Sequence, residues 1–274
     1  MTGVPPGTRD TSVTWGDVVF SAVLVIALDT STPAVTAGLV ALDGGGPRPL
    51  AQRVTVNARA HGELLTPHLM AAVSEAGHRL ADADAIVVGS GPGPFTGLRA
   101  GMVTAAALGQ ALDVPVHPVC SLDAIAAAVP ETAAAQGVLA DVGEPGAAVS
   151  GAAAGGMRLL VATDARRKEV YWAAYGPDRE RLTGPHVHRP ADVPAEIAEL
   201  DLDFAAGEMA AAHGDVFGLP VLDTEYPTPT GLVAAARHDL HSGEEPLPLV
   251  PMYLRRPDAT APGPRKQVSP EAAS

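Results

Sequence analysis

The strongest candidates for a functional site form a glycine-rich loop between an apolar strand and a helix. Its sequence is Gly89-Ser-Gly-Pro-Gly-Pro-Phe-Thr-Gly97. Glycines let a backbone approach a ligand closely, and a helix start offers unpaired N–H groups at its positive end. Thr96 is expected to cap this helix, and Arg99 adds a cation in its first turn. The loop is therefore either an anion or nucleotide-phosphate site or a tight turn whose glycines only permit close packing. It matches neither a P-loop nor a dinucleotide fingerprint.

Two acidic turns are the other candidates for chemistry. Asp29-Thr-Ser31 follows an apolar strand, and Asp164 begins a turn in the second half of the chain. Two such aspartates could place Mg²⁺ and a nucleophilic water or hydroxyl, as in a self-contained ATPase or small-molecule kinase. The same turns also serve as caps and hairpin connections, so both interpretations stay open. Ala206-Gly-Glu208 is only a short trace of the glycine-rich turn that an adenosine pocket would need.

The histidines and the cysteine give no pattern for a metal site or a nucleophile. There are 9 histidines but no His-Glu-x-x-His helix, so the metalloprotease hypothesis has no patterned ligand set. The single Cys120 has no companion and is expected to be a small buried hydrophobe. No Gly-x-Ser-x-Gly elbow is present either. We therefore expect no metal ligands and no catalytic residues.

Composition and charge narrow the partners. The 274 residues carry a net charge of −13, and the only lysines are Lys168 and Lys266, so no basic stripe exists along the sequence. Because nucleic-acid binding depends on clustered Lys and Arg, any nucleic-acid role is expected to be indirect. The longest apolar run, Val18–Leu28, is too short for a membrane helix and lacks the flanks of a signal peptide. The sequence thus predicts a cytoplasmic protein without membrane contact.

Hydrophobic periodicity predicts a mixed sheet with covering helices in the first half. Three strands joined by tight turns should form an antiparallel meander, and the helix after them either kinks at Pro67 or starts with Thr66 as its cap. The expected strands are Val23–Leu28, Ala34–Leu42, Leu50–Val56, Ala85–Val88 and Val114–Val119, and the expected helices are His61–Gly77, Thr96–Leu112 and Ser121–Val129.

The second half is predicted to form a smaller lobe. Leu159–Thr163 and Glu169–Tyr175 should make a hairpin, and a helix is expected over Thr230–Asp239 with Thr228 or Thr230 as its cap. Whether this last helix packs on the first lobe stays open. The expected division is a disordered extension at 1–21, a first lobe at 22–119, a second lobe at 120–256 with an Ala/Gly-rich insertion at 132–156, and a disordered tail at 257–274.

Five motifs in order resemble the TsaB (YeaZ) family and span roughly Val23 to Arg256. They are Ala27-Leu-Asp-Thr-Ser31, His61-Gly-Glu-Leu-Leu-Thr-Pro67, Gly91-Pro-Gly-Pro-Phe-Thr-Gly-Leu-Arg99, Thr163-Asp-Ala-Arg-Arg-Lys-Glu-Val-Tyr171 and Pro251-Met-Tyr-Leu-Arg255. The resemblance implies an α/β fold of the actin, Hsp70 and sugar-kinase kind, with two RNase-H-like lobes. It also implies a pocket facing nucleotide phosphates, and its residues here would be Asp29, Thr30, Ser31, Gly91, Gly93, Thr96, Gly97, Arg99 and Asp164.

The same resemblance implies a role in assembly. A member of this family partners TsaD, the larger paralogous subunit, in making N6-threonylcarbamoyladenosine in tRNA, with an ATPase subunit, TsaE, joining through the complex. TsaD carries the transferase chemistry, and ATP or ADP is a candidate only at the subunit interface of the complex. Here the histidine-rich metal motif of TsaD is replaced by Val116-His-Pro-Val-Cys-Ser-Leu-Asp123, so the metal site is absent. The resemblance therefore implies a non-catalytic partner subunit.

Two helices are expected to provide the partner interface. The residues assigned to it are His61, Leu64, Leu65, His68, Leu69, Val73, Leu98, Met102, Val103 and Ala106. Because an exposed apolar face seeks cover, a homodimer is expected when the partner is missing. A charge at Met102 or Leu69 is expected to abolish the heterodimer while leaving the monomer folded.

Overall fold

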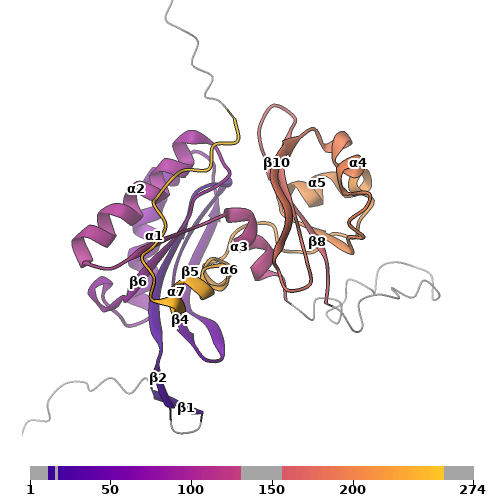
Figure 1. Cartoon of the computed structure of the whole chain (residues 1–274). Coiled ribbons are helices and arrows are strands. Elements are labelled where there is room, and N and C mark those ends of the chain that lie inside the picture. The colour runs from indigo at the N-terminus through magenta and orange to yellow at the C-terminus, as the bar shows by residue number, and fades with distance from the viewer. Residues whose placement is uncertain (1–11, 16–17, 131–155, 256–274) are drawn as a thin grey trace, which may run out of the picture.

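The computed structural model describes residues 12–15, 18–130 and 156–255, and it confirms an α/β fold with two mixed sheets (Figure 1). The first lobe holds a sheet in the order β5-β4-β3-β6-β7. Its strands are β3 (Val23–Asp29), β4 (Ala34–Asp43), β5 (Gly46–Val56), β6 (Ala85–Gly89) and β7 (Val116–Val119). The expected meander is confirmed, because β3–β4 and β4–β5 are antiparallel, whereas β6 runs parallel to β3 and to β7.

The third strand begins at Gly46 rather than at the predicted Leu50. The added residues include Pro47 and Pro49, which cannot donate to a ladder. β5 is an edge strand of the sheet, so these prolines have no second neighbour strand that needs their hydrogen bonds.

Two helices cover one face of this sheet. They are α1 (His61–Glu75) and α2 (Phe95–Leu112), separated by the short 3₁₀ turn η1 (Leu80–Asp82) and β6. Leu65 and Leu69 of α1 and Leu98 of α2 join Ile26 and Ile86 in one buried core. The helix α1 continues through Pro67 from His61 onward, so the alternative start with Thr66 as cap is wrong.

The second lobe repeats the same arrangement on a smaller scale. Its sheet has the order β10-β9-β8-β11, with an antiparallel meander and β11 parallel to β8. The predicted hairpin is confirmed by β8 (Leu159–Asp164) and β9 (Val170–Tyr175). The remaining elements are β10 (Arg181–His188), η4 (Pro190–Asp192), α4 (Val193–Ile197), β11 (Phe204–Ala206) and α5 (Glu208–Phe217). Buried Trp172 packs here with Val193 of α4 and Phe217 of α5.

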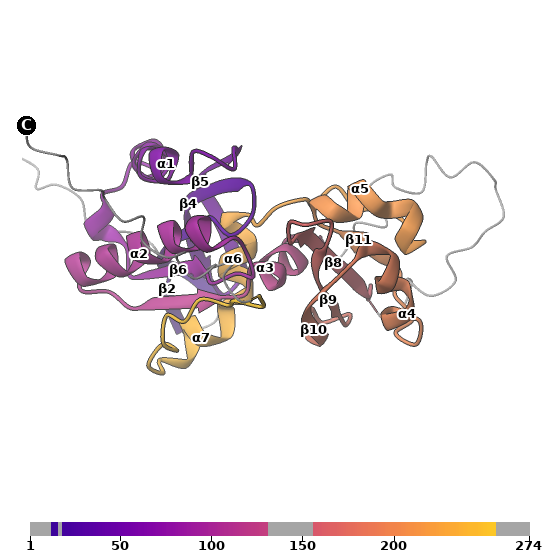
Figure 2. The same ribbon diagram turned by 90° about the horizontal axis from the view of Figure 1, so that it is seen from above.

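The helix α3 (Ser121–Ala128) joins the lobes and confirms the helix predicted there. It lies between the two sheets in the view from above (Figure 2). Leu122 and Ile125 are buried in the core that contains Tyr175 of the second lobe, whereas Ala124 is buried with Val25 of the first. One short helix therefore contributes to both cores.

The chain returns to the first lobe after the second sheet, which answers the question left open about the last helix. The predicted helix is split into α6 (Pro229–Ala235) and α7 (Arg237–Ser242), and the Thr228 hydroxyl accepts the Gly231 N–H at 3.0 Å as the cap. Leu232 and Val233 of α6 are buried against the first sheet. The expected assignment of 120–256 to the second lobe thus differs from the structure at α6, α7 and Leu249, which pack on the first lobe.

Residues 247–255, the C-terminal strap, run along the first lobe and end beside the second (Figure 1, yellow). Leu249 packs on the core of the first lobe, and Leu254 packs on the core that includes Tyr175 of the second. The Met252 N–H donates to the Ser90 carbonyl at 2.8 Å. The strap therefore touches the glycine loop and both lobes.

The N-terminal extension contains regular structure that the sequence interpretation missed. β1 (Ser12–Trp15) and β2 (Val18–Ser21) pair antiparallel, so the expectation of disorder over 1–21 is wrong for these residues. Their β-branched and aromatic residues favour strands. Residues 1–11, 16–17, 131–155 and 256–274 lie outside the described residues, and with them all but one residue of the predicted insertion at 132–156 and the whole predicted tail at 257–274. Within the described ranges, no helix has the length and apolarity to cross a bilayer.

Candidate functional site

Asp29 ends β3 and is fully enclosed by the protein. Its Oδ1 accepts hydrogen bonds from the Ser31 N–H and the Ser31 hydroxyl, both at 2.8 Å, and its Oδ2 accepts one from the Ser121 hydroxyl at 2.6 Å. The residue has no exposed surface, and this burial raises the pKa of its carboxyl group above the ordinary value. Asp29 therefore ties the turn after β3 to the start of α3.

The glycine loop packs directly on this turn. A Cβ added at Gly89 would lie 1.7 Å from Asp29 Oδ2, and one at Gly93 would lie 2.2 Å from the Ser31 carbonyl oxygen. Thr30 completes the contact, because its hydroxyl donates to the Gly97 carbonyl at 2.7 Å and accepts the Gly101 N–H at 2.9 Å. At these glycines not even a methyl group fits between loop and turn, so the loop and the turn are in direct contact.

The start of α2 differs from the prediction. The N-cap position is Pro94, with extended backbone and no side-chain cap, and Thr96 is an exposed residue of the first turn, so the expected Thr96 cap is wrong. The φ angle of −64° at Pro94 ends the loop in a geometry from which the helix can begin at once. The sequence suggested Thr96 because threonine is a common cap.

Arg99 contacts Tyr253, a residue that sequence spacing alone could not identify as its neighbour. Its Nε donates to the Tyr253 hydroxyl at 3.0 Å, and its guanidinium lies 3.8 Å from the centre of the Phe95 ring. The Phe95 and Tyr253 rings stack with centroids 5.3 Å apart. The late motif Pro251-Met-Tyr-Leu-Arg255 thus meets the glycine-loop motif in space, and only the fold reveals this contact.

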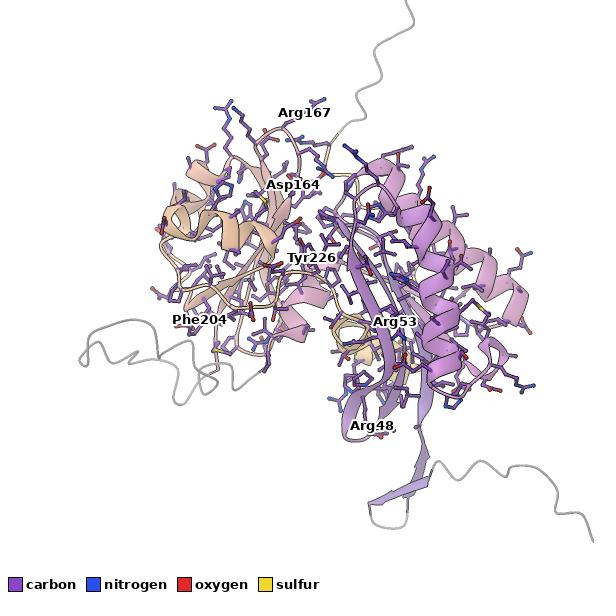
Figure 3. The ribbon with its side chains drawn as sticks, turned by 180° about the vertical axis from the view of Figure 1, so that it is seen from behind. Arg48, Arg53, Asp164, Arg167, Phe204 and Tyr226 are labelled. Carbon is purple, nitrogen blue, oxygen red and sulfur yellow. The ribbon has the colours of Figure 1, made fainter. Side chains whose placement is uncertain are left out.

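Asp164 ends β8 of the second lobe (Figure 3), whereas the other residues of the predicted pocket come from elements of the first lobe. Its Oδ1 accepts the Arg166 N–H at 2.7 Å, and its Oδ2 lies 3.3 Å from an Arg166 guanidinium nitrogen. The Asp164 N–H donates to Glu208 Oε1 at 3.1 Å. The carboxylate therefore holds the hairpin turn together.

Glu208 and Tyr226 are residues that sequence reasoning missed. Glu208 begins α5 after Gly207, whose φ of 97° and close approach to the Ala162 carbonyl require glycine. Burial raises the pKa of Glu208, which also receives a hydrogen bond from the Tyr226 hydroxyl. The turn Ala206-Gly-Glu208, considered above for adenosine, thus carries a carboxylate whose hydrogen bonds are made with other groups of the protein.

Most of the expected partner-interface residues lie inside the protein. In α1 and α2 the residues that form the core instead of a surface are His61, Leu65, Leu69, Val73, Leu98 and Met102. Leu64 and His68 are half-buried, and only Val103 and Ala106 of the predicted set are exposed. The assignment is corrected because these helices press their apolar stripe onto the sheet. His61 shows this, since its Nε2 lies 2.8 Å from the Thr32 carbonyl.

Of the large apolar residues exposed on these helices, Val103 belongs to the predicted set, whereas Met70 and Phe95 do not. Met70 of α1 is 49% exposed, and Phe95 and Val103 of α2 are 44% and 65% exposed. Large apolar side chains of this exposure are the residues available to a partner. We call Met70, Phe95 and Val103 the apolar surface residues.

The described residues contain no group of three or more His, Cys, Asp or Glu that could hold a metal ion. His117 and Asp123, considered in the sequence, have separate surroundings. His117 is buried on β7, and Asp123 accepts a hydrogen bond from the Tyr175 hydroxyl at 2.8 Å and pairs with Arg181.

Comparisons with known proteins agree with the motifs. A family model described as TsaD, tRNA N6-adenosine threonylcarbamoyltransferase, matches residues 53–143. An uncharacterized protein of Mycobacterium tuberculosis, Rv3421c, is 47% identical over 86% of this chain and 93% of the relative. An uncharacterized protein of Mycobacterium leprae, ML0378, is 48% identical over 86% of this chain, which spans 56% of that relative's length.

Named relatives and a solved structure complete the comparison. The tRNA threonylcarbamoyladenosine biosynthesis protein TsaB of Escherichia coli is 32% identical over 58% of this chain and 57% of that protein. A crystal structure of an uncharacterized Pseudomonas aeruginosa protein, described as similar to peptidase YeaZ, aligns with a TM-score of 0.61 and 29% identity. It covers 85% of this chain and 100% of the solved one. These matches, with the five ordered motifs, show that the chain belongs to the TsaB (YeaZ) family.

Proposed function

We propose that this chain is a non-catalytic subunit that binds and supports the TsaD transferase in the synthesis of N6-threonylcarbamoyladenosine in tRNA. The similarity to the Escherichia coli protein TsaB, a tRNA threonylcarbamoyladenosine biosynthesis protein, supports this pathway. The match to the TsaD family model supports a common origin with the proposed partner. In this proposal the complex is cytoplasmic, and TsaE joins it through TsaD.

The observation that carries the proposal is the apolar surface of α1 and α2. Met70, Phe95 and Val103 lie on two helices that pack on the same face of one sheet. Interfaces between subunits bury such aromatic, Met and aliphatic side chains at their centre. Without TsaD, a second copy of the chain covers the same surface, and the protein forms a homodimer.

The enclosed Asp29 supports a binding role over self-contained catalysis. Both oxygens of its carboxylate are engaged by Ser31 and Ser121, so Mg²⁺ would have to displace these bonds. The loop Gly89–Gly97 already fills the space above the turn. We therefore assign no catalytic residue to this chain, and ATP or ADP would bind only where the partner completes a site.

The test is coexpression with TsaD from the same genome, with Val103→Glu and Met70→Glu variants. Each places a charge on the apolar surface without touching the core, so both should fail to copurify with TsaD and should elute as monomers in size-exclusion chromatography. The control is Val216→Glu, because Val216 is 42% exposed on α5 of the other lobe. The control should retain both assemblies.

A tRNA modification assay with each subunit omitted completes the test. Omission of this chain should abolish or strongly reduce threonylcarbamoyl transfer, and the Val103→Glu variant should not restore it. If Val103→Glu and Met70→Glu copurify with TsaD as the wild type does, the proposed surface is wrong.

A further inference from the structure

The C-terminal strap makes its contacts with both lobes through every third residue. Leu249 packs on the core of the first lobe, and Met252 packs on the core that includes Tyr175 of the second. Arg255 forms an ion pair with Glu169, which follows the hairpin turn of the second lobe. The strap is therefore attached to the first lobe near its start and to the second lobe at its end.

Prolines make this segment stiff. Pro248 and Pro251 each begin a γ-turn, in which the Val250 N–H donates to the Pro248 carbonyl at 2.8 Å and the Tyr253 N–H donates to the Pro251 carbonyl at 3.0 Å. The proline ring fixes φ at both positions. A stiff segment transmits a displacement of one end to the other, whereas a flexible one would absorb it.

The helix α3 is the pivot between the lobes. Its first residue, Ser121, is held by the first lobe, because its N–H donates to the Gly91 carbonyl at 2.7 Å and its hydroxyl donates to Asp29. The rest of α3 is buried mainly in the core of the second lobe. It meets α6 through small residues, since a Cβ added at Gly231 would lie 2.2 Å from the Ala124 carbonyl oxygen. Packed helices permit small sliding movements between domains, so α3 alone leaves the angle between the lobes adjustable.

The strap is a second link between the lobes, at some distance from this pivot. The Met252 N–H donates to the Ser90 carbonyl at 2.8 Å and anchors the strap on the first lobe. Leu254 and Arg255 then reach the second lobe, and Figure 1 shows this end of the strap above α3 at the rim between the lobes. A rotation about α3 would pull Leu254 and Arg255 away from the second lobe, so the attached strap restrains the rotation.

The strap also touches the surface assigned to the partner. The Tyr253 ring stacks on the Phe95 ring with centroids 5.3 Å apart, and the Tyr253 hydroxyl accepts the Arg99 Nε–H at 3.0 Å. Phe95 remains 44% exposed with Tyr253 in place, and Tyr253 itself is 37% exposed. A partner that covers the rest of Phe95 therefore also confines Tyr253, and with it the strap.

We propose that the strap is a latch that fixes the angle between the lobes, and that a partner bound over Phe95 holds the latch closed. The proposal rests on the proposed function only for the choice of TsaD as that partner. Binding on the first lobe is then coupled to the orientation of the second. Because such coupling is reciprocal, opening the latch weakens partner binding, and partner binding closes the latch.

The test follows the distance between the lobes in the full chain by single-molecule FRET. Dyes are attached at Arg48→Cys on β5 and Asp215→Cys on α5, two exposed positions outside the strap and the apolar surface. The native Cys120 stays unlabelled, because burial raises the pKa of its thiol to about 12 and the thiolate is the reactive form. The dilution of the experiment keeps a second copy from covering Phe95. The wild type should give a single narrow distribution.

Arg255→Glu should open the latch, because it places two carboxylates face to face. Its FRET distribution should shift or broaden, and TsaD should bind it roughly twofold to fivefold more weakly, the range that an exposed ion pair supplies. Saturating TsaD should return the distribution to that of the wild type. The charge swap Glu169→Lys/Arg255→Glu restores opposite charges and should bring both readouts back towards the wild type.

Two further variants make the result specific. Arg189→Glu is the matched control, because Arg189 is exposed on the second lobe, lies outside the strap and gives the same change in net charge. It should leave the FRET distribution and TsaD binding unchanged. Leu254→Ala removes an apolar contact with the second lobe without changing any charge. It should also open the latch, and it replaces Arg255→Glu if that variant does not fold by circular dichroism.

The outcomes separate this proposal from the proposed function. A wild-type distribution in both Arg255→Glu and Leu254→Ala would refute the latch. Opening of the latch without any loss of TsaD affinity would refute its coupling to the partner. Val103→Glu should keep the wild-type distribution as a free chain and lose only the response to TsaD. A wild type that does not bind TsaD contradicts the proposed function and the coupling, and the free chain still decides whether the strap is a latch.

Discussion

Asp29 illustrates how a residue suited to catalysis can be used for structure. Carboxylates after a first strand could place a metal, and the sequence supported this as well as it supported a structural turn. In the structure, Ser31 and Ser121 supply three hydrogen bonds to this carboxylate. The contact between Asp29 and Ser121 joins two elements far apart in the sequence, so no local pattern could indicate it.

The buried Asp29 carboxyl predicts a pH dependence. Burial raises the pKa of the Asp29 carboxyl in the folded state. Between its ordinary value of 3.8 and this raised pKa, the folded protein therefore binds more protons than the unfolded chain. This group therefore reduces stability as pH rises through that range. Asp29→Asn removes this titration. The free energy of unfolding of the variant minus that of the wild type should therefore increase as the pH rises above 4.

Urea denaturation of both proteins at several pH values measures this difference. Other carboxyl groups titrate in the same range, but their contribution is common to wild type and variant and cancels. A difference that is constant with pH, or one that favours the wild type increasingly at higher pH, would contradict the prediction.

The glycine loop shows what sequence can and cannot determine at this scale. Its position between strand and helix was predictable from turn chemistry. Its contact with the Asp29 turn depends on the parallel register of β3 and β6, in which Leu28 pairs with Val88. That register is a tertiary property, so the two interpretations of the loop could not be separated beforehand.

At the scale of elements, the helices were predicted well and their faces poorly. Apolar spacing located α1 and α2 to within a few residues. Apolar and alanine residues surround most of α2, however, and alanine suits either a core or a surface. The sequence therefore did not reveal that Met102 faces the sheet while its neighbour Val103 faces outward.

This orientation reverses an expectation about mutations. Leu69 is 1% exposed and Met102 is 5% exposed, so Glu at either position would bury an unpaired charge. Each should cost about 3 kcal/mol or more of stability or prevent folding. Val103→Glu should change stability by no more than about 0.5 kcal/mol. Thermal unfolding of the three variants tests this, and a soluble, wild-type-like Leu69→Glu protein would refute the assigned burial.

At the scale of the whole molecule, the two-lobe fold was predictable but its division was not. Strand patterns and tight turns predicted the meander of the first lobe and the β8–β9 hairpin of the second, but β10 was not predicted. Nothing in residues 229–255 indicated which sheet they cover, because Leu232 and Val233 would suit either core. Which lobe a late segment of the chain packs on is determined by tertiary contacts, and local sequence patterns do not reveal these contacts.

A shortened chain tests the importance of this return. A fragment of residues 22–228 lacks α6 and leaves Val25, Val40 and Leu42 of the first sheet without their cover. It should aggregate or unfold without a cooperative transition, because exposed apolar strands associate. Coexpression of residues 229–255 as a separate peptide should restore soluble protein. A cooperative thermal transition in the fragment alone would show that the cover is dispensable.

The same return has a consequence for biosynthesis. The ribosome releases the strands of the first sheet early, yet the helix that seals one side of it leaves the exit tunnel only after the entire second lobe has been made. The nascent first lobe must therefore wait with an open hydrophobic side while the second lobe folds. During that interval the exposed apolar surface of the nascent chain is available to chaperones. Codons that slow translation before residue 229 would prolong the exposure of this surface.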